Sequence, residues 1–149
     1  MRDLDLAQLE DKKKLLDDRH YRRCRHIVSE IQRVKNAYSA LQRGDVVQLG
    51  KLVTASHVSL RDDYEISCAE LDALVEILNS YPEVHGSRLV GGGFGGCTVS
   101  LVDSPQLDQV IDKVRTEYGA LLGRPPWVHA ATPSDPVGPA PAIELPGVP

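Results

Sequence analysis

A run of six residues, Gly91-Gly92-Gly93-Phe94-Gly95-Gly96, contains five of the twelve glycines in this chain of 149 residues. Glycine adopts positive φ angles freely and allows a backbone to lie close to a ligand, so clustered glycines suit a phosphate-binding loop. Residues 87–90 precede the run and residues 97–102 follow it, and both flanks alternate β-branched or apolar residues with polar ones. The pattern therefore predicts a strand, a glycine loop and a second strand.

The run can be compared with two known phosphate-binding motifs. Gly91, Gly93 and Gly96 satisfy the dinucleotide pattern GxGxxG, but that pattern requires a helix directly after its last glycine. Residues 97–102 are typical of a strand, which argues against the dinucleotide interpretation. A Walker loop ends in Gly-Lys-Ser/Thr, and no lysine follows the last glycine here. A plain hairpin connection needs only one or two glycines, so five indicate close backbone approach.

Two other groups of residues could take part in chemistry. Asp62 and Asp63 are adjacent carboxylates, but such a pair before a helix more often holds the turn or the helix N-terminus, so we expect a structural role. His57 is expected on a helix face, because no serine or cysteine nucleophile is evidently paired with it. No Cys/His spacing resembles a zinc site. The residues themselves therefore indicate no catalytic group and no metal ligand.

The composition restricts the class of protein. The chain can bury one core, and its 42% hydrophobic and 26% charged residues are ordinary for a globular domain. The net charge is −4, and aspartates interrupt the basic residues of segments 12–14 and 22–25, so we expect no nucleic-acid partner. No apolar run approaches the roughly 20 residues of a membrane span, so no membrane partner is expected. Three separated cysteines (Cys24, Cys68 and Cys97) indicate reduced thiols in the cytoplasm.

Hydrophobic periodicity predicts the elements that position the glycine run. The clearest is a helix over 20–42, where apolar residues recur every three or four positions and Gly44 provides the stop signal. Ser67 and Glu70 have the spacing of a capping box at the start of a later helix. The expected order is a helix over 4–17, the helix over 20–42, helices over 45–60 and 67–79, strands over 87–90 and 97–102, a helix over 107–121, and a strand over 127–131.

This order predicts an α+β fold in which helices cover one face of a small antiparallel sheet. Six of the ten prolines lie from Pro133 onward, among few large apolar residues, so residues 133–149 are expected to form a disordered Pro-rich tail. The predicted division is a folded domain over 1–132 and this tail.

Three stretches of the chain resemble the galactokinases, a branch of the GHMP family of small-molecule kinases. They are residues 25–31 with their continuation 41–45, residues 56–72, and residues 86–99, which include the glycine run. The stretches occur in the family's order, and the similarity extends from about residue 4 to about residue 135. The resemblance implies the GHMP kinase C-terminal domain over residues 1–132.

The resemblance also implies a reaction, in which ATP phosphorylates galactose to give galactose 1-phosphate and ADP, with Mg²⁺ on the nucleotide phosphates. The family's Gly/Ser-rich phosphate loop, and the Asp and Arg near the sugar hydroxyl, belong to an N-terminal lobe whose motifs are absent from this sequence. We therefore expect a fragment corresponding to the C-terminal lobe of a galactokinase, inactive by itself. Its expected partners are ATP, galactose and the N-terminal lobe.

By the same resemblance, the glycines of the run lie near the nucleotide phosphates: Gly91, Gly92, Gly93, Gly95 and Gly96. Arg88 could face a phosphate, although an ion pair with a helix carboxylate is equally compatible with its position. Phe94 is expected to pack as an anchor rather than to stack on adenine. Cys97 is expected to be a small core residue.

Other functions stay open at the level of sequence. The chain could be a non-catalytic interaction module, with the stripe of residues 20–42 exposed for a partner. A galactokinase-like fold could also act on N-acetylgalactosamine or serve as a sugar sensor. The residues that select the sugar are expected outside this chain, so the sequence does not choose among these functions.

Overall fold

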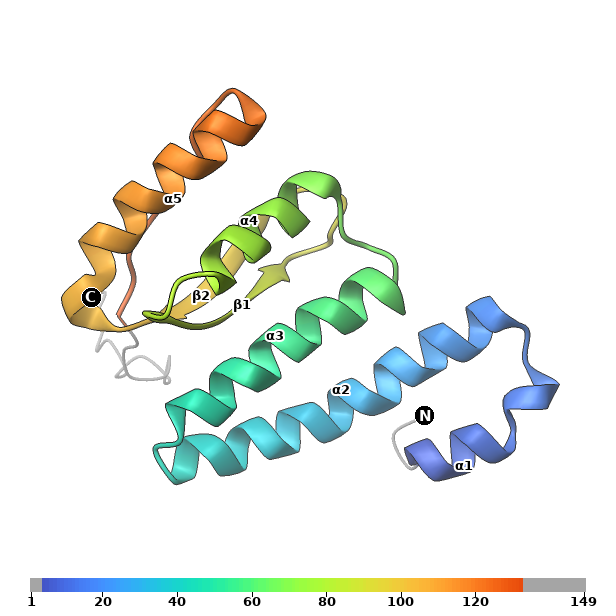
Figure 1. Cartoon of the computed structure of the whole chain (residues 1–149). Coiled ribbons are helices and arrows are strands. Elements are labelled where there is room, and N and C mark those ends of the chain that lie inside the picture. The colour runs from blue at the N-terminus through green and yellow to red at the C-terminus, as the bar shows by residue number, and fades with distance from the viewer. Residues whose placement is uncertain (1–3, 133–149) are drawn as a thin grey trace, which may run out of the picture.

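The structure, a computed structural model, describes residues 4–132, and it has the predicted α+β architecture (Figure 1). A two-stranded antiparallel sheet lies among five α-helices in the described part of the chain. The elements in chain order are α1 (Leu6–Asp11), a 3-10 turn (Lys13–Leu15), α2 (Asp18–Gln42), α3 (Val46–Asp62), α4 (Ala69–Asn79), β1 (Val84–Val90), β2 (Cys97–Val102), a second 3-10 turn (Ser104–Gln106) and α5 (Leu107–Leu122).

α2 and α3 form an antiparallel helical hairpin, and an aspartate caps the start of each helix. Asp17 accepts the backbone N–H of His20 at 2.9 Å, and Asp45 accepts the backbone N–H of Gln48 at 2.9 Å. These side chains satisfy N–H groups that have no partner within the helix. Gly44, at the turn between the helices, has φ +66°, which confirms its predicted role as a stop signal.

The apolar stripe of α2 is buried in its first half and exposed in its second. Tyr21 and Val28, only 3% and 4% exposed, form a cluster with Leu9 of α1. Three large side chains farther along the helix are 62–66% exposed: Val34, Tyr38 and Leu41. The hydrophobic periodicity therefore correctly predicts the helix, but packing within the described residues uses only part of its apolar face.

β1 and β2 are joined by the glycine loop and pair in antiparallel register. Leu89 lies opposite Thr98, and an irregularity between Val84 and Gly86 places one extra residue in β1. The side of β1 away from β2 is covered by α3, which approaches very closely. A Cβ atom added to Gly50 of α3 would lie 2.0 Å from the His85 carbonyl oxygen, so only glycine allows this contact.

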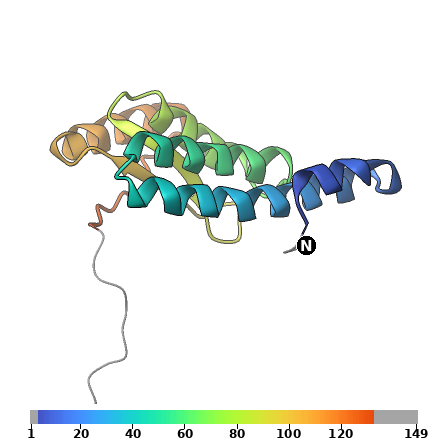
Figure 2. The same cartoon turned by 90° about the horizontal axis from the view of Figure 1, so that it is seen from below.

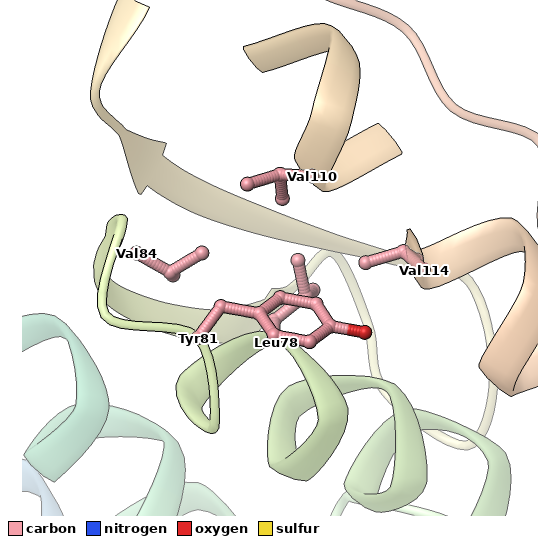
Figure 3. Close-up of a cluster of buried hydrophobic side chains, with 5 residues drawn as sticks. All are labelled: Leu78, Tyr81, Val84, Val110 and Val114. Atoms are coloured by element: carbon pink, nitrogen blue, oxygen red, sulfur yellow. The ribbon is translucent and has the colours of Figure 1, made fainter. Parts of the chain in front are cut away.

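α4 and α5 cover one face of the sheet with a core of five buried side chains (Figure 3). Figure 3 shows Val110 and Val114 of α5 above Tyr81 and Leu78, with Val84 of β1 beside them. All five are less than 9% exposed. This cluster accounts for the predicted amphipathic pattern of α4 and α5, and it holds both helices against the sheet.

Three local predictions are wrong. The helix predicted over 4–17 is interrupted, because α1 ends at Asp11 and a separate 3-10 turn follows over Lys13–Leu15. The predicted capping box is absent, because α4 begins at Ala69 after Cys68, and the Ser67 hydroxyl donates to Asp72 Oδ1 at 2.5 Å instead. Residues 127–131 form no strand. Trp127 is 89% exposed, and neither β1 nor β2 pairs with this segment, so its strand-like composition has no partner strand among the described residues.

The Pro-rich tail predicted over 133–149 lies outside the described residues. Within residues 4–132, no helix combines the length and the apolar character that crossing a bilayer requires.

Candidate functional site

The glycine run forms the connection between β1 and β2, as predicted, and no helix follows it. Four of its glycines have positive φ angles: Gly91 at +93°, Gly93 at +79°, Gly95 at +132° and Gly96 at +106°. Residues with a Cβ atom rarely adopt these angles, so the backbone path of the loop depends on glycine. Figure 2 shows the loop projecting past the layer formed by α2 and α3.

The middle of the loop is fixed to the segment between α3 and α4. The Phe94 N–H donates to the Ile66 carbonyl at 2.7 Å. A Cβ atom added to Gly93 would lie 2.2 Å from the same carbonyl oxygen, which is a close backbone approach of the kind the sequence predicts. The Phe94 side chain is 75% exposed, so the prediction that it packs as an anchor is wrong. Its backbone is what holds the loop, and its φ of +57° turns the ring outward.

The rest of the loop is open. Atoms added at the Cβ positions of Gly91, Gly92 and Gly95 would meet nothing within 4 Å. A surface pocket lies beside Phe94 and is lined by Cys24 and Ile27 of α2 and by Tyr64, Ile66 and the ion-paired Arg23 and Glu65. The loop therefore has one side against the protein and another side accessible to a ligand or to another segment.

Arg88 points from β1 toward the helical hairpin. Its Nη1 atom donates to Ser56 Oγ of α3 at 2.8 Å and lies 3.7 Å from Glu30 Oε2 of α2. Its Nε atom donates to the carbonyl of Leu89 at 3.0 Å. Burial lowers the pKa of the guanidinium. Arg88 thus makes the ion pair with a helix carboxylate that the sequence left as one of two alternatives.

Asp62 and Asp63 have the structural role expected of them, although they bind side chains rather than backbone N–H groups. Asp63 is 7% exposed and forms an ion pair with Arg25 of α2, and Ser59 Oγ donates to it at 3.3 Å. Asp62 accepts from Arg61 at 2.7 Å, and that guanidinium lowers the pKa of the Asp62 carboxyl. Asp63 connects the end of α3 to α2, Asp62 pairs within α3, and the two carboxylates are not arranged as a catalytic pair.

His57 lies on a helix face as predicted, whereas the environment of Cys97 differs from the one expected. His57 is 2% exposed, and its Nδ1 atom accepts the backbone N–H of Leu89 at 3.3 Å. It lies one turn after Val53 and one turn before Leu60, so its place on the apolar face of α3 was visible in the sequence. Cys97 is exposed rather than buried, because strand alternation places it with Val99 on the face that α4 and α5 leave uncovered.

The described residues contain no group of three or more His, Cys, Asp or Glu side chains placed to hold a metal ion. The chemistry available near the loop is that of backbone N–H groups, an open glycine surface and a pocket that combines apolar side chains with the Arg23–Glu65 ion pair. Exposed backbone N–H groups of this kind are suited to binding anions.

Comparisons with known proteins agree with this domain. Residues 37–120 match the family described as "GHMP kinases C terminal". The galactokinase of Bos taurus is 48% identical over 118 residues, and that of Homo sapiens is 46% identical over 119 residues. The alignments cover 79% and 80% of this chain but 30% of each relative. The chain therefore spans about 30% of the length of these relatives.

Solved structures of two kinases also match this chain. The crystal structure of Lactococcus lactis galactokinase complexed with galactose matches with a TM-score of 0.78 and 36% identity, over 82% of this chain and 32% of that chain. The structure of L. major mevalonate kinase in complex with R-mevalonate matches with a TM-score of 0.55 and 28% identity, over 71% of this chain and 34% of that chain. The matched family region includes α3, α4 and both strands with the glycine loop between them. The chain belongs to the GHMP kinase family, and its described residues have the fold of that family's C-terminal domain.

Proposed function

We propose that this chain is the C-terminal lobe of a galactokinase, whose intact form transfers the γ-phosphate of ATP to galactose and produces galactose 1-phosphate. The observation that carries the proposal is the 48% identity to bovine galactokinase over 118 residues. The structural match to a galactokinase at a TM-score of 0.78 supports it. The sequence identity and the TM-score are both higher than those of the mevalonate kinase structure, which are 28% and 0.55.

The glycine loop is proposed to lie against the phosphates of ATP. Four positive φ angles and the open space at Gly91, Gly92 and Gly95 support this role, because a phosphate can approach backbone that carries no side chain. Arg88 lies in the strand that leads into the loop, and a contact with a phosphate would require its guanidinium to leave Glu30 and Ser56. Mg²⁺ would be carried by the nucleotide phosphates, since the described residues contain no metal-binding cluster.

Phosphoryl transfer requires a phosphate cradle, a metal ion and a group that orients the attacking hydroxyl. The described residues provide one wall of such a site, and the two adjacent aspartates are engaged in ion pairs. We therefore propose that the chain needs an N-terminal lobe for catalysis. We further place the intact protein in the cytoplasm, which the three unpaired cysteines support.

A chimera tests this function directly. The matching C-terminal 30% of bovine galactokinase would be replaced by this chain, and ADP release would be measured with Mg·ATP and either galactose or N-acetylgalactosamine. We expect galactose 1-phosphate from the chimera and none from the chain alone. Turnover by the pure chain would contradict the need for a second lobe. A folded chimera that prefers N-acetylgalactosamine or phosphorylates neither sugar would contradict the galactokinase assignment.

A second candidate function is a non-catalytic interaction module. The exposed residues Val34, Tyr38 and Leu41 of α2 favour it, because they form a stripe of large apolar side chains at helical spacing. Sedimentation velocity of the chain at increasing concentration distinguishes the two. Concentration-dependent association would support a module if replacing Val34, Tyr38 and Leu41 together by serine abolishes it. A chain that stays monomeric at all concentrations would count against a module.

A further inference from the structure

Leu89 occupies a special position in β1, two residues before the glycine loop. On the side of the strand away from β2, both of its backbone groups bind side chains. The N–H donates to His57 Nδ1 at 3.3 Å, and the carbonyl accepts from Arg88 Nε at 3.0 Å. An exposed strand edge would leave such groups to water or to another strand. Here α3 and β1 themselves provide the partners, and Leu89 is 1% exposed.

The second ring nitrogen of His57 faces α4. Nε2 lies 3.2 Å from Asp72 Oδ1, and the same oxygen accepts the hydroxyl of Ser67 at 2.5 Å. Ser67 directly follows Ile66, whose carbonyl accepts the N–H of Phe94 in the loop. His57 is therefore connected to the loop in two ways, through Leu89 at its entrance and through the 66–72 segment at its middle.

We propose that His57 is a positioning residue for the glycine loop, acting as a neutral imidazole that accepts from Leu89 through Nδ1, while its Nε2–H lies beside Asp72 without the geometry of a hydrogen bond. The effect of this arrangement on nucleotide binding rests on the proposed function, whereas the positioning itself does not. The tautomer follows from the contacts, because a backbone N–H can be accepted only by the unprotonated nitrogen.

The surroundings keep the ring neutral. Burial lowers the pKa of His57, the charges of Arg61 on its own helix and Arg88 on β1 act in the same direction, and Asp72 on α4 opposes them. Glu76 of α4 and His57 both line a second surface pocket, separate from the one beside Phe94. A second proton would have to bind at Nδ1, which would remove the acceptor for the Leu89 N–H. Acidification should therefore release the strand just where the loop begins.

Nuclear magnetic resonance of the 15N-labelled 149-residue chain tests this proposal without any nucleotide. The ring nitrogens of His57 report the tautomer, and amide hydrogen exchange reports protection at Leu89 and Phe94. We expect the Nε2–H tautomer at neutral pH, with protection of these two amides falling as His57 becomes protonated. The amides of α5 should keep their protection over the same range. A proton on Nδ1 at neutral pH, or unchanged protection while His57 titrates, would overturn the proposal.

Two variants separate positioning from a general contribution to packing. His57→Asn retains an oxygen near the position of Nδ1 but cannot titrate, so Leu89 should stay protected and lose its pH dependence. His57→Leu removes the acceptor, and the Leu89 and Phe94 amides should exchange about five- to tenfold faster, as expected for the loss of one hydrogen bond. Equal exchange in both variants would contradict the role of Nδ1. Because these measurements need no substrate, an inactive chimera would refute the proposed function alone.

Discussion

Replacing Gly93 by alanine should distort the glycine loop more than any other single methyl group added within it. Gly93 has φ +79°, and its added Cβ atom would lie 2.2 Å from the carbonyl oxygen of Ile66. That oxygen is the acceptor for Phe94 N–H, so the clash falls on the hydrogen bond that holds the middle of the loop. Backbone atoms cannot rotate away as a flexible side chain could, and the loop itself must move.

The expected decrease in the free energy of unfolding of Gly93→Ala has two parts. A left-handed backbone costs a residue with a Cβ atom about 1–2 kcal/mol relative to glycine. Displacing the loop from Ile66 loses a hydrogen bond and tight packing, which together cost about 1–2 kcal/mol more. The free energy of unfolding should therefore fall by about 2–4 kcal/mol. For a chain of this size the midpoint of thermal unfolding should decrease by roughly 4 °C per kcal/mol.

Gly92→Ala provides a matched control in the same loop. Its Cβ atom would meet nothing within 4 Å, and its φ lies outside the left-handed range. This variant should change the free energy of unfolding by less than about 0.5 kcal/mol, as expected of a surface substitution. Urea denaturation followed by circular dichroism measures both variants, and hydrogen exchange of Phe94 shows whether the loss is located at the loop.

If Gly93→Ala is as stable as Gly92→Ala and keeps the Phe94 amide protected, the close approach to Ile66 does not determine the path of the loop. In the active chimera, the same Gly93→Ala change should weaken ATP binding more than it alters the galactose dependence, because Gly93 is proposed to lie on the nucleotide side of the site.

Two other predictions concern the stability of the fold. Gly50→Ala would place a Cβ atom 2.0 Å from the His85 carbonyl oxygen. The free energy of unfolding, measured by urea denaturation, should fall by at least about 3 kcal/mol, because overpacking against a backbone is not relieved by rotamer changes. A denaturation midpoint equal to that of the unaltered chain would exclude this contact. Burial lowers the pKa of both His26 and His57. Their unfolded forms therefore bind protons first, and the free energy of unfolding should decrease as pH falls below about 6.5. Denaturation midpoints that stay constant from pH 7.5 to 5.5 would contradict this prediction.

The helices and strands could be predicted because their signals are local. Apolar residues at helical spacing define α2, α4 and α5, and the alternating flanks of the glycine run define the two strands. The failures arise where two local signals compete. Ser67 has the spacing of a cap, but its hydroxyl donates to Asp72, so α4 begins without a side-chain cap. Residues 127–131 have strand-like composition, but a strand also needs a pairing partner, and neither β1 nor β2 pairs with them.

The site was harder to predict, because its contacts join segments far apart in sequence. The residue type of Phe94 predicts a core anchor, but its backbone is left-handed and its side chain is 75% exposed. His57 lacks a neighbouring nucleophile, which correctly argues against a catalytic base. Its actual contact is a backbone N–H 32 residues away, and no local pattern encodes that pairing.

These long-range contacts give a physical reason why two stretches that resemble galactokinases occur together. Residues 56–72 and 86–99 meet at four places: Ser56 at Arg88, His57 at Leu89, the buried contact of Leu60 and Leu71 with Leu89, and Ile66 at the middle of the loop. A loop with four left-handed glycines has little conformational preference of its own, and neighbouring segments must supply the order that it lacks. Residues 56–72 provide that order, so a change in their buried face should alter the loop even where it leaves every glycine intact.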